Sequence, residues 1–87
     1  MVYLITYDLN REINRPPIVT IIKELGAWAC LSESSYAIET ASTVTAIYRA
    51  LAPLLDSNDS LLVVTLRAPW TGHAPAEVME WLHERLA

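Results

Sequence analysis

Hydrophobic and polar residues follow two different spacings along this chain. Four short stretches rich in β-branched and aromatic residues predict β-strands, and they cover residues 2–8, 27–31, 35–40 and 60–66. Three other stretches carry apolar residues at helical spacing, namely Ile18, Ile21, Ile22 and Leu25; Val44, Ile47, Tyr48 and Leu51; and Val78, Met79, Leu82 and Leu86. The predicted order is therefore β-α-β-β-α-β, followed by a last helix.

Several residues mark where the predicted helices begin and end. Pro16 and Pro17 suit the first turn of the first helix. Gly26 stands where a glycine in the left-handed conformation commonly caps a helix C-terminus. Ser42 or Thr43 is positioned to cap the second helix.

The element order predicts one small α+β domain. The first six elements match the split β-α-β arrangement of a ferredoxin-like fold, β-α-β-β-α-β with a four-stranded antiparallel sheet. A chain of 87 residues has room for a single domain. We therefore expect residues 1–87 to form one ferredoxin-like domain with a C-terminal helix.

The predicted strands are apolar on both faces. In residues 60–66, Leu62 and Val64 point to one side while Leu61 and Val63 point to the other. A sheet with one face in water should instead alternate apolar with polar residues. The second face therefore needs a cover, either the C-terminal helix or a second copy of the chain. Charged residues make up only 18% of the chain, where about 25% is usual, which favours a second copy and predicts a homodimer.

Charge and cysteine content exclude several classes of protein. The formal net charge of −4 argues against a nucleic-acid-binding protein that works through a general basic field, although a few placed arginines remain compatible with one. One cysteine cannot close a disulfide within the chain. No apolar run approaches the roughly 20 residues of a membrane span, and the first residues lack the pattern of a signal peptide. We therefore expect a cytoplasmic protein that does not insert into membranes.

Asp8 is the most suggestive candidate for chemistry. It ends the first predicted strand, behind an apolar run. Mg²⁺ is often held by one or two carboxylates, with water and phosphate oxygens completing the octahedron. A two-fold axis could bring two copies of Asp8 together at such an ion. The alternative is that the Asp8 side chain caps the turn that follows it, as Asp often does.

Three arginines are candidates for binding phosphate. Arg11 and Arg15 follow Asp8 in the loop before the first helix, and Arg67 leaves the last strand just before Trp70. Guanidinium groups hold phosphate oxygens in bidentate fashion. The alternatives are solvated loop arginines, one of them paired with a nearby Glu, and a surface loop beside a packed Trp.

The other reactive side chains form no recognisable site. His73 and His83 lie ten residues apart with no second His or Cys at metal-ligand spacing. Cys30 lies in an apolar predicted strand and is expected in the core. No glycine-rich phosphate loop is present, since the chain holds only two glycines.

The apolar first strand ending in Tyr7 and Asp8, the arginine-containing loop and the β-α-β-β-α-β order together resemble the Cas2 family of CRISPR-associated proteins. VapD-type toxin ribonucleases form a related group. Residues 34–39 (SSYAIE) are similar to that family's Ser-Val-Phe-Glu stretch. The resemblance covers about residues 1–67 in the order of its elements.

The resemblance implies a ferredoxin-like homodimer that holds a divalent metal, Mg²⁺, between the protomers. Asp8 would be the metal ligand, with Tyr7 and Arg15 as supporting catalytic residues. Such proteins are either metal-dependent nucleases acting on RNA or DNA, or scaffolds beside the Cas1 integrase during CRISPR adaptation. By the residue candidates above, Arg11, Arg15 and Arg67 would contact the nucleic acid.

The chain also departs from the family pattern. Its second strand contains no arginine, the chain is acidic, and residues 75–86 look helical where many family members carry a fifth strand. Two functions are therefore compatible with the sequence. One is a metal-dependent endonuclease with a role in CRISPR adaptation or as a toxin, and the alternative is a non-catalytic homodimeric adaptor of the same fold.

Overall fold

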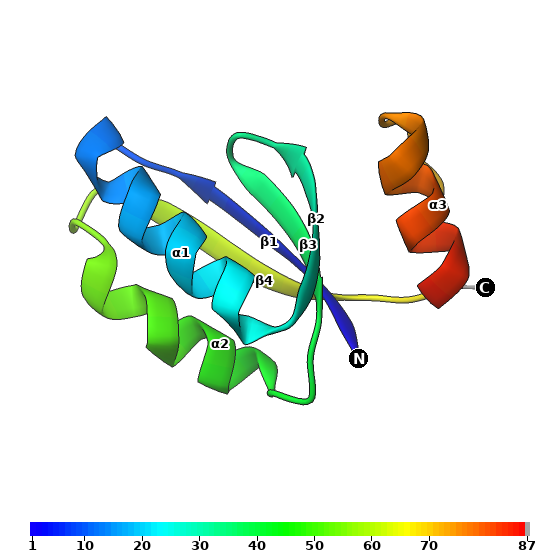
Figure 1. Ribbon diagram of the computed structural model, residues 1–87. Helices are drawn as coiled ribbons and strands as arrows, with labels where there is room; N and C mark the ends of the chain where they lie inside the picture. Colours follow the sequence, from blue (N-terminus) through cyan, green and yellow to red (C-terminus); the bar gives the residue numbers. More distant parts are fainter. Residues whose placement is uncertain (87) are drawn as a thin grey trace.

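Four antiparallel strands form one sheet in the computed structural model, which describes residues 1–86 (Figure 1). The strands are β1 (Val2–Asp8), β2 (Ala27–Ser32), β3 (Ser35–Glu39) and β4 (Ser60–Leu66). The α-helices are α1 (Arg15–Leu25), α2 (Val44–Leu51) and α3 (Ala76–Arg85), and two short 3₁₀ helices are η1 (Glu12–Asn14) and η2 (Ala52–Leu54). All four strands and all three α-helices expected from the sequence are therefore present.

The strand order confirms the predicted fold class. Within the sheet the order is β2-β3-β1-β4, and β1 pairs antiparallel with both β3 and β4. β1 and β2 are separated by one strand in the sheet, and so are β3 and β4. A helix lies in each of these two connections, α1 after β1 and α2 after β3. The architecture is therefore a ferredoxin-like α+β fold with an additional C-terminal helix.

The main core lies between the sheet and the two crossover helices. Figure 1 shows α1 and α2 side by side on one face of the sheet. The side chains that are completely buried include Ile5, Ile38, Ile18 and Ile47, one each from β1, β3, α1 and α2. Burying one such side chain contributes about 1.5–3 kcal/mol. The apolar residues at alternate positions of the strands therefore pack, in this layer, against the apolar residues at helical spacing.

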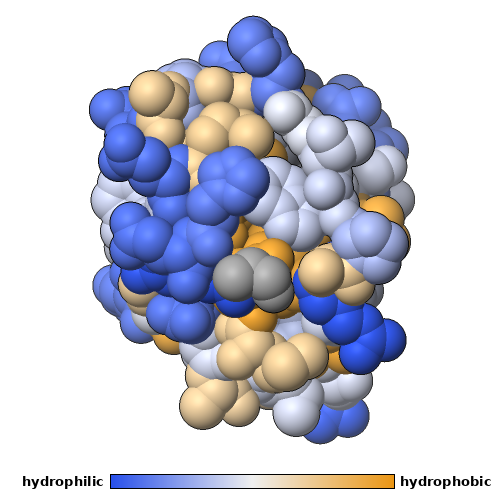
Figure 2. Space-filling model, turned by 90° about the vertical axis from the view of Figure 1, so that its right-hand side faces the viewer, coloured by the Kyte–Doolittle hydropathy of each residue, from blue (hydrophilic) through white to orange (hydrophobic). Residues whose placement is uncertain are grey.

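Helix α3 covers only part of the opposite face. Val78 and Leu82 of α3 pack in a second apolar cluster with Val2, Ala29 and Ala37 of the sheet. Figure 1 shows α3 apart from α1 and α2. Figure 2 shows that hydrophobic residues reach the surface between hydrophilic ones on the side where α3 lies. The C-terminal helix, one of the two alternative covers expected from the sequence, thus covers part of this face.

The rest of that face is left uncovered along β4. The side chain of Leu62 is 58% exposed and that of Val64 is 38% exposed. These two residues lie opposite Thr6 and Leu4 of β1, so all four share one face of the sheet. Apolar surface thus remains open beyond the part of the face that α3 covers.

Two expectations about single residues are wrong. Gly26 is not in the left-handed region, because its φ of 165° and ψ of −164° are extended. A glycine is nevertheless required, since a Cβ atom at this position would run into the carbonyl oxygen of Glu39. Cys30 is exposed rather than in the core, because it lies on edge strand β2, where the neighbouring Trp28 is also 41% exposed. Of the two capping candidates, Thr43 is the N-cap of α2 and accepts a hydrogen bond from the Ala46 amide (3.1 Å).

Candidate functional site

Asp8 lies at the end of β1 with its carboxylate exposed. It pairs across the sheet with Ser60 and shares a face with Thr6. These three residues, together with Tyr7, Leu61 and Leu62, line a shallow depression of about 330 Å³. Within residues 1–86 the Asp8 carboxylate accepts no hydrogen bond, so the expected capping of the following turn is not observed. Oxygen atoms of a carboxylate and two hydroxyls suit a hard cation, but the described residues contain no cluster of three or more His, Cys, Asp or Glu side chains that could hold a metal ion.

Tyr7 and Arg15 lie together on the other side of the sheet. The Tyr7 hydroxyl donates a hydrogen bond to the carbonyl oxygen of Glu33 (2.9 Å), and an Arg15 Nη1–H group donates to the same oxygen. The Arg15 guanidinium lies 5.7 Å from the centre of the Tyr7 ring. Burial raises the pKa of Tyr7, and the neighbouring Arg15 opposes that rise. This pair fastens the start of α1 to the β2–β3 turn rather than facing Asp8.

Arg15 is further occupied by an ion pair. Its Nε and Nη2 atoms donate to the two carboxylate oxygens of Glu12, each at 2.9 Å, and its side chain is only 19% exposed. The hydrogen bonds from Arg15 lower the pKa of Glu12. Because both edges of the guanidinium already have partners, little of it remains to bind a phosphate.

Arg11 belongs to a polar network between two loops. Its guanidinium donates to both carboxylate oxygens of Asp56, at 2.8 and 3.0 Å, and Asn14 Nδ2 donates to Asp56 at 2.9 Å. The Asp59 carboxylate accepts from the backbone amides of Asn10 and Asp56, both at 2.7 Å. The hydrogen bond from Arg11 lowers the pKa of Asp56. The network joins the loop after β1 to the loop before β4, which accounts for Arg11 without any ligand.

Arg67 is exposed at the far end of the sheet. It follows the last residue of β4, Leu66, which pairs with Val2, whereas Asp8 pairs with Ser60 at the other end. Six residues of strand separate the two ends, about 20 Å at 3.4 Å per residue. Arg67 and Asp8 therefore do not share a site within one chain.

The proposed catalytic residues are thus not brought together. Asp8 faces one side of the sheet, whereas Tyr7 and Arg15 lie on the other. Arg11 is held by Asp56, and Arg67 is at the opposite end. What the structure places on one surface instead is Asp8 and the exposed apolar residues of β4.

A feature that sequence reasoning missed is an apolar pocket beneath α3. It has a volume of about 200 Å³ and is lined mainly by Leu4, Leu31, Leu66, Trp70, Met79 and Leu82. The Trp70 indole donates to the carbonyl oxygen of Leu86 (3.1 Å), and its ring lies 4.9 Å from that of His83. The only sign of this pocket in the sequence was Trp70, in a loop that contains Pro and Gly, and the sequence does not show which residues pack around it.

The chain matches no model of a known protein family, and comparison with curated proteins finds no significant similarity. The resemblance to the Cas2 family therefore stays a prediction from the sequence. None of the helices in residues 1–86 is long and apolar enough to cross a membrane.

Proposed function

We propose that this protein is a non-catalytic homodimeric adaptor with a ferredoxin-like fold that works in the cytoplasm. The observation that carries the proposal is the exposed apolar surface of β4, where Leu62 and Val64 stand 58% and 38% exposed beyond the area that α3 covers. Exposed apolar residues that lie side by side mark interaction surfaces in soluble proteins. A binding role needs this surface, whereas hydrolysis of a phosphodiester does not.

The arginines give a second argument for an adaptor. Arg11 and Arg15 both form bidentate ion pairs with carboxylates of the same chain. A guanidinium that is already paired must give up those hydrogen bonds before it can bind a phosphate. The net charge of −4 per chain adds a general repulsion of nucleic acid.

The second candidate function is a Mg²⁺-dependent nuclease of the Cas2 or VapD type, and one observation favours it. The Asp8 carboxylate is exposed and has no partner among residues 1–86, so it is available to a cation. Thr6 and Ser60 lie beside it. In this candidate function, Mg²⁺ held by Asp8 would supply the activated water, and a Cas1-like integrase would be the partner in CRISPR adaptation.

Two measurements on one preparation separate these functions. The mass in solution, from analytical ultracentrifugation, should be twice that of the chain. Incubation with single-stranded RNA and with duplex DNA in Mg²⁺ or Mn²⁺ should give no cleavage above that of a buffer blank.

Cleavage that depends on the metal and is lost in Asp8→Asn would overturn the adaptor and establish the nuclease. Glu80→Gln is the matched control, since it removes another exposed carboxylate, on α3. A chain that is monomeric at all concentrations would also overturn the proposal.

A further inference from the structure

The two edges of the sheet are protected to different degrees. Strand β2 has an irregularity in its pairing between Cys30 and Ser32, and Lys23 lies over Trp28 at 4.4 Å from the ring centre. Irregular pairing and lysines are common ways of blocking an edge strand. The residues of β4 (SLLVVTL), like those of β2 (AWACLS), include no charge and no proline, but β4 pairs with β1 without any register shift. An uncharged, regular edge strand is a template for pairing with another strand.

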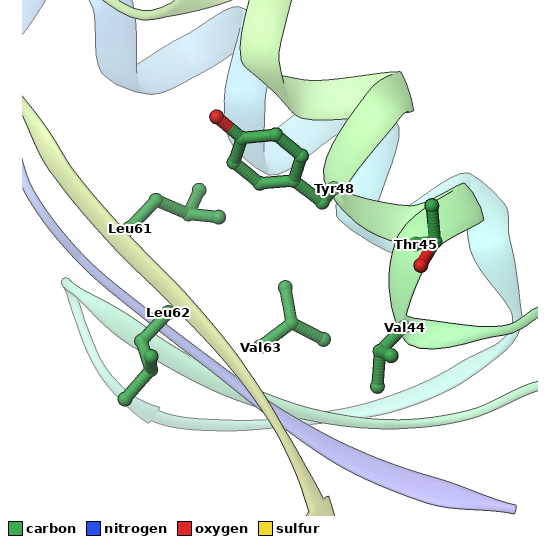
Figure 3. Close-up of a pocket in the computed structure, with 6 residues that line it drawn as sticks. All are labelled: Val44, Thr45, Tyr48, Leu61, Leu62 and Val63. Atoms are coloured by element: carbon green, nitrogen blue, oxygen red, sulfur yellow. The ribbon is translucent and has the colours of Figure 1, made fainter.

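A groove with an apolar wall runs beside this open edge. Figure 3 shows that Leu61 and Val63 of β4 point toward α2, while Leu62 points away from it. Across the groove stand Val44 and Tyr48 of α2, and these are 39% and 49% exposed. Both sides of an added strand would therefore meet apolar residues, Leu61 and Val63 on the helix side and Leu62 on the other.

The sequence of β4 identifies a second copy of the same strand as the occupant. If two copies pair antiparallel about a two-fold axis through Val63, the numbers of any two residues that stand opposite each other add up to 126. Leu62 then stands opposite Val64 of the second copy, so the two exposed apolar side chains of the strand cover each other. All seven residues of the strand have partners, which no other centre achieves.

Charge at the ends of the strand supports the same register. With the axis at Val63, Asp59 of one copy stands opposite Arg67 of the other, and the symmetry makes two such pairs. The Asp59 carboxylate keeps its hydrogen bonds to the backbone amides of Asn10 and Asp56, so the attraction is between two nearby opposite charges. Moving the axis by one residue in either direction places Arg67 opposite Ser57 or Leu61 and separates the charges. Arg67 is exposed and forms no ion pair within residues 1–86, so it is free to meet the partner.

We propose that two copies of this chain join through their β4 edges, in antiparallel register about Val63, to form one continuous eight-stranded sheet. The inference rests on the proposed homodimer and specifies its surface. The axis stands perpendicular to the sheet, because residues that face each other in this register lie on the same face. Both α2 helices therefore lie on the same side of the joined sheet, and Val44 and Tyr48 of the two copies flank the seam.

Cross-linking tests the register directly. In a Cys30→Ser background, which removes the exposed native thiol, Val63→Cys should form a disulfide with its own copy on mild oxidation. Leu62→Cys and Val64→Cys should each fail to link alone but should link when the two variants are mixed. Opposite residues in antiparallel strands have Cβ atoms about 4.5–5.5 Å apart, whereas diagonal neighbours are farther. The mixed pair also covers the case in which Val63→Cys does not fold, because both residues are exposed.

A charge reversal tests the ends of the strand. Arg67→Glu would place two acidic groups at each end of the seam and should raise the dimer dissociation constant about tenfold, because two exposed ion pairs are replaced by like charges. Lys23→Glu makes the same change of charge beside β2, at the other edge of the sheet, and should leave dissociation unchanged. A dimer that persists with cross-links at other positions would overturn this register and leave the adaptor standing. A monomer at all concentrations would overturn both.

Discussion

Gly26, between α1 and β2, provides the sharpest test of the packing described above. Its backbone is extended, a conformation open to any residue, so the left-handed strain of a helix cap is not involved. A Cβ atom added here would lie inside 3.0 Å of the Glu39 carbonyl oxygen, closer than real Cβ atoms come, and 3.1 Å from the carbonyl carbon. Glu39 is at the end of β3 and pairs with both Ala27 and Val2. The obstacle is therefore backbone in the middle of a sheet, which cannot move aside alone.

The expected cost of Gly26→Ala is about 3 kcal/mol. Forcing one extra carbon into a packed site costs about 1–3 kcal/mol. Pulling the Ala27–Glu39 pair apart adds about 1 kcal/mol for each hydrogen bond lost. At about 0.05–0.15 kcal/mol per residue, a chain of this length has about 4–13 kcal/mol of stability in total. The substitution should therefore remove a large share of the free energy of unfolding.

Urea denaturation followed by far-ultraviolet circular dichroism measures this change. Gly72→Ala is the matched control, because a Cβ atom there meets nothing within 4 Å, and it should be neutral or slightly stabilising through its effect on the unfolded chain. Gly26→Asn separates the two explanations for the glycine. A left-handed cap would accept Asn almost as well as Gly, whereas a close backbone approach makes Asn at least as harmful as Ala. A loss below about 1 kcal/mol for Gly26→Ala, or a near-native Gly26→Asn, would refute the reasoning.

Two further substitutions test the loop network and the cover of the second face. Hydrogen bonds from Arg11 lower the pKa of Asp56, so the stability that this carboxylate provides is present above its unfolded pKa of about 4 and is lost as the pH falls through the lower folded value. Asp56→Asn should therefore flatten the fall of unfolding free energy between about pH 5 and pH 2, measured by urea titration at each pH, and an unchanged slope would contradict this. Leu82→Ala, at a side chain 6% exposed in the cluster under α3, should cost about 2–4 kcal/mol. Ile13→Ala, at a side chain 74% exposed, should change stability by less than about 0.5 kcal/mol, and equal effects of the two would contradict the assigned role of α3.

The fold could be predicted because its signals are local and repeated. The period-two runs gave the bounds of β1 and β4 as observed, and the helical spacing of residues 18–25 gave α1. Ferredoxin-like topology then followed from the order of elements alone. The prediction of a left-handed conformation for Gly26 was wrong. A glycine is needed there because of its close contact with Glu39, thirteen residues away, and no local pattern carries that information. The prediction that Cys30 lies in the core was wrong because the local sequence does not indicate that β2 is an edge strand.

The candidate site was less predictable because its residues depend on partners from distant segments. Nothing near Arg11 in the sequence indicates that Asp56 will pair with it. Arg15 has its partner Glu12 three residues away, so the simpler explanation of a local ion pair was visible and is observed. For Asp8 and Tyr7, the alternation of a strand already places neighbouring side chains on opposite faces. That rule alone argues against Asp8 and Tyr7 acting at one point.

The dimer register proposed above also bears on the metal hypothesis. Asp8 lies level with Ser60, which the register places opposite Leu66 of the second copy. The two Asp8 residues would then be six residues apart along the strands, about 20 Å, and three strand spacings apart across them, about 14 Å, or about 25 Å in all. A cation with ligands at about 2.1 Å cannot bridge that distance, so a dimer joined through β4 leaves each Asp8 alone. Mg²⁺ should therefore not change the dimer dissociation constant, in wild type or in Asp8→Asn. A dimer that Mg²⁺ tightens, and that Asp8→Asn makes insensitive to Mg²⁺, would refute the β4 register and place the two carboxylates face to face.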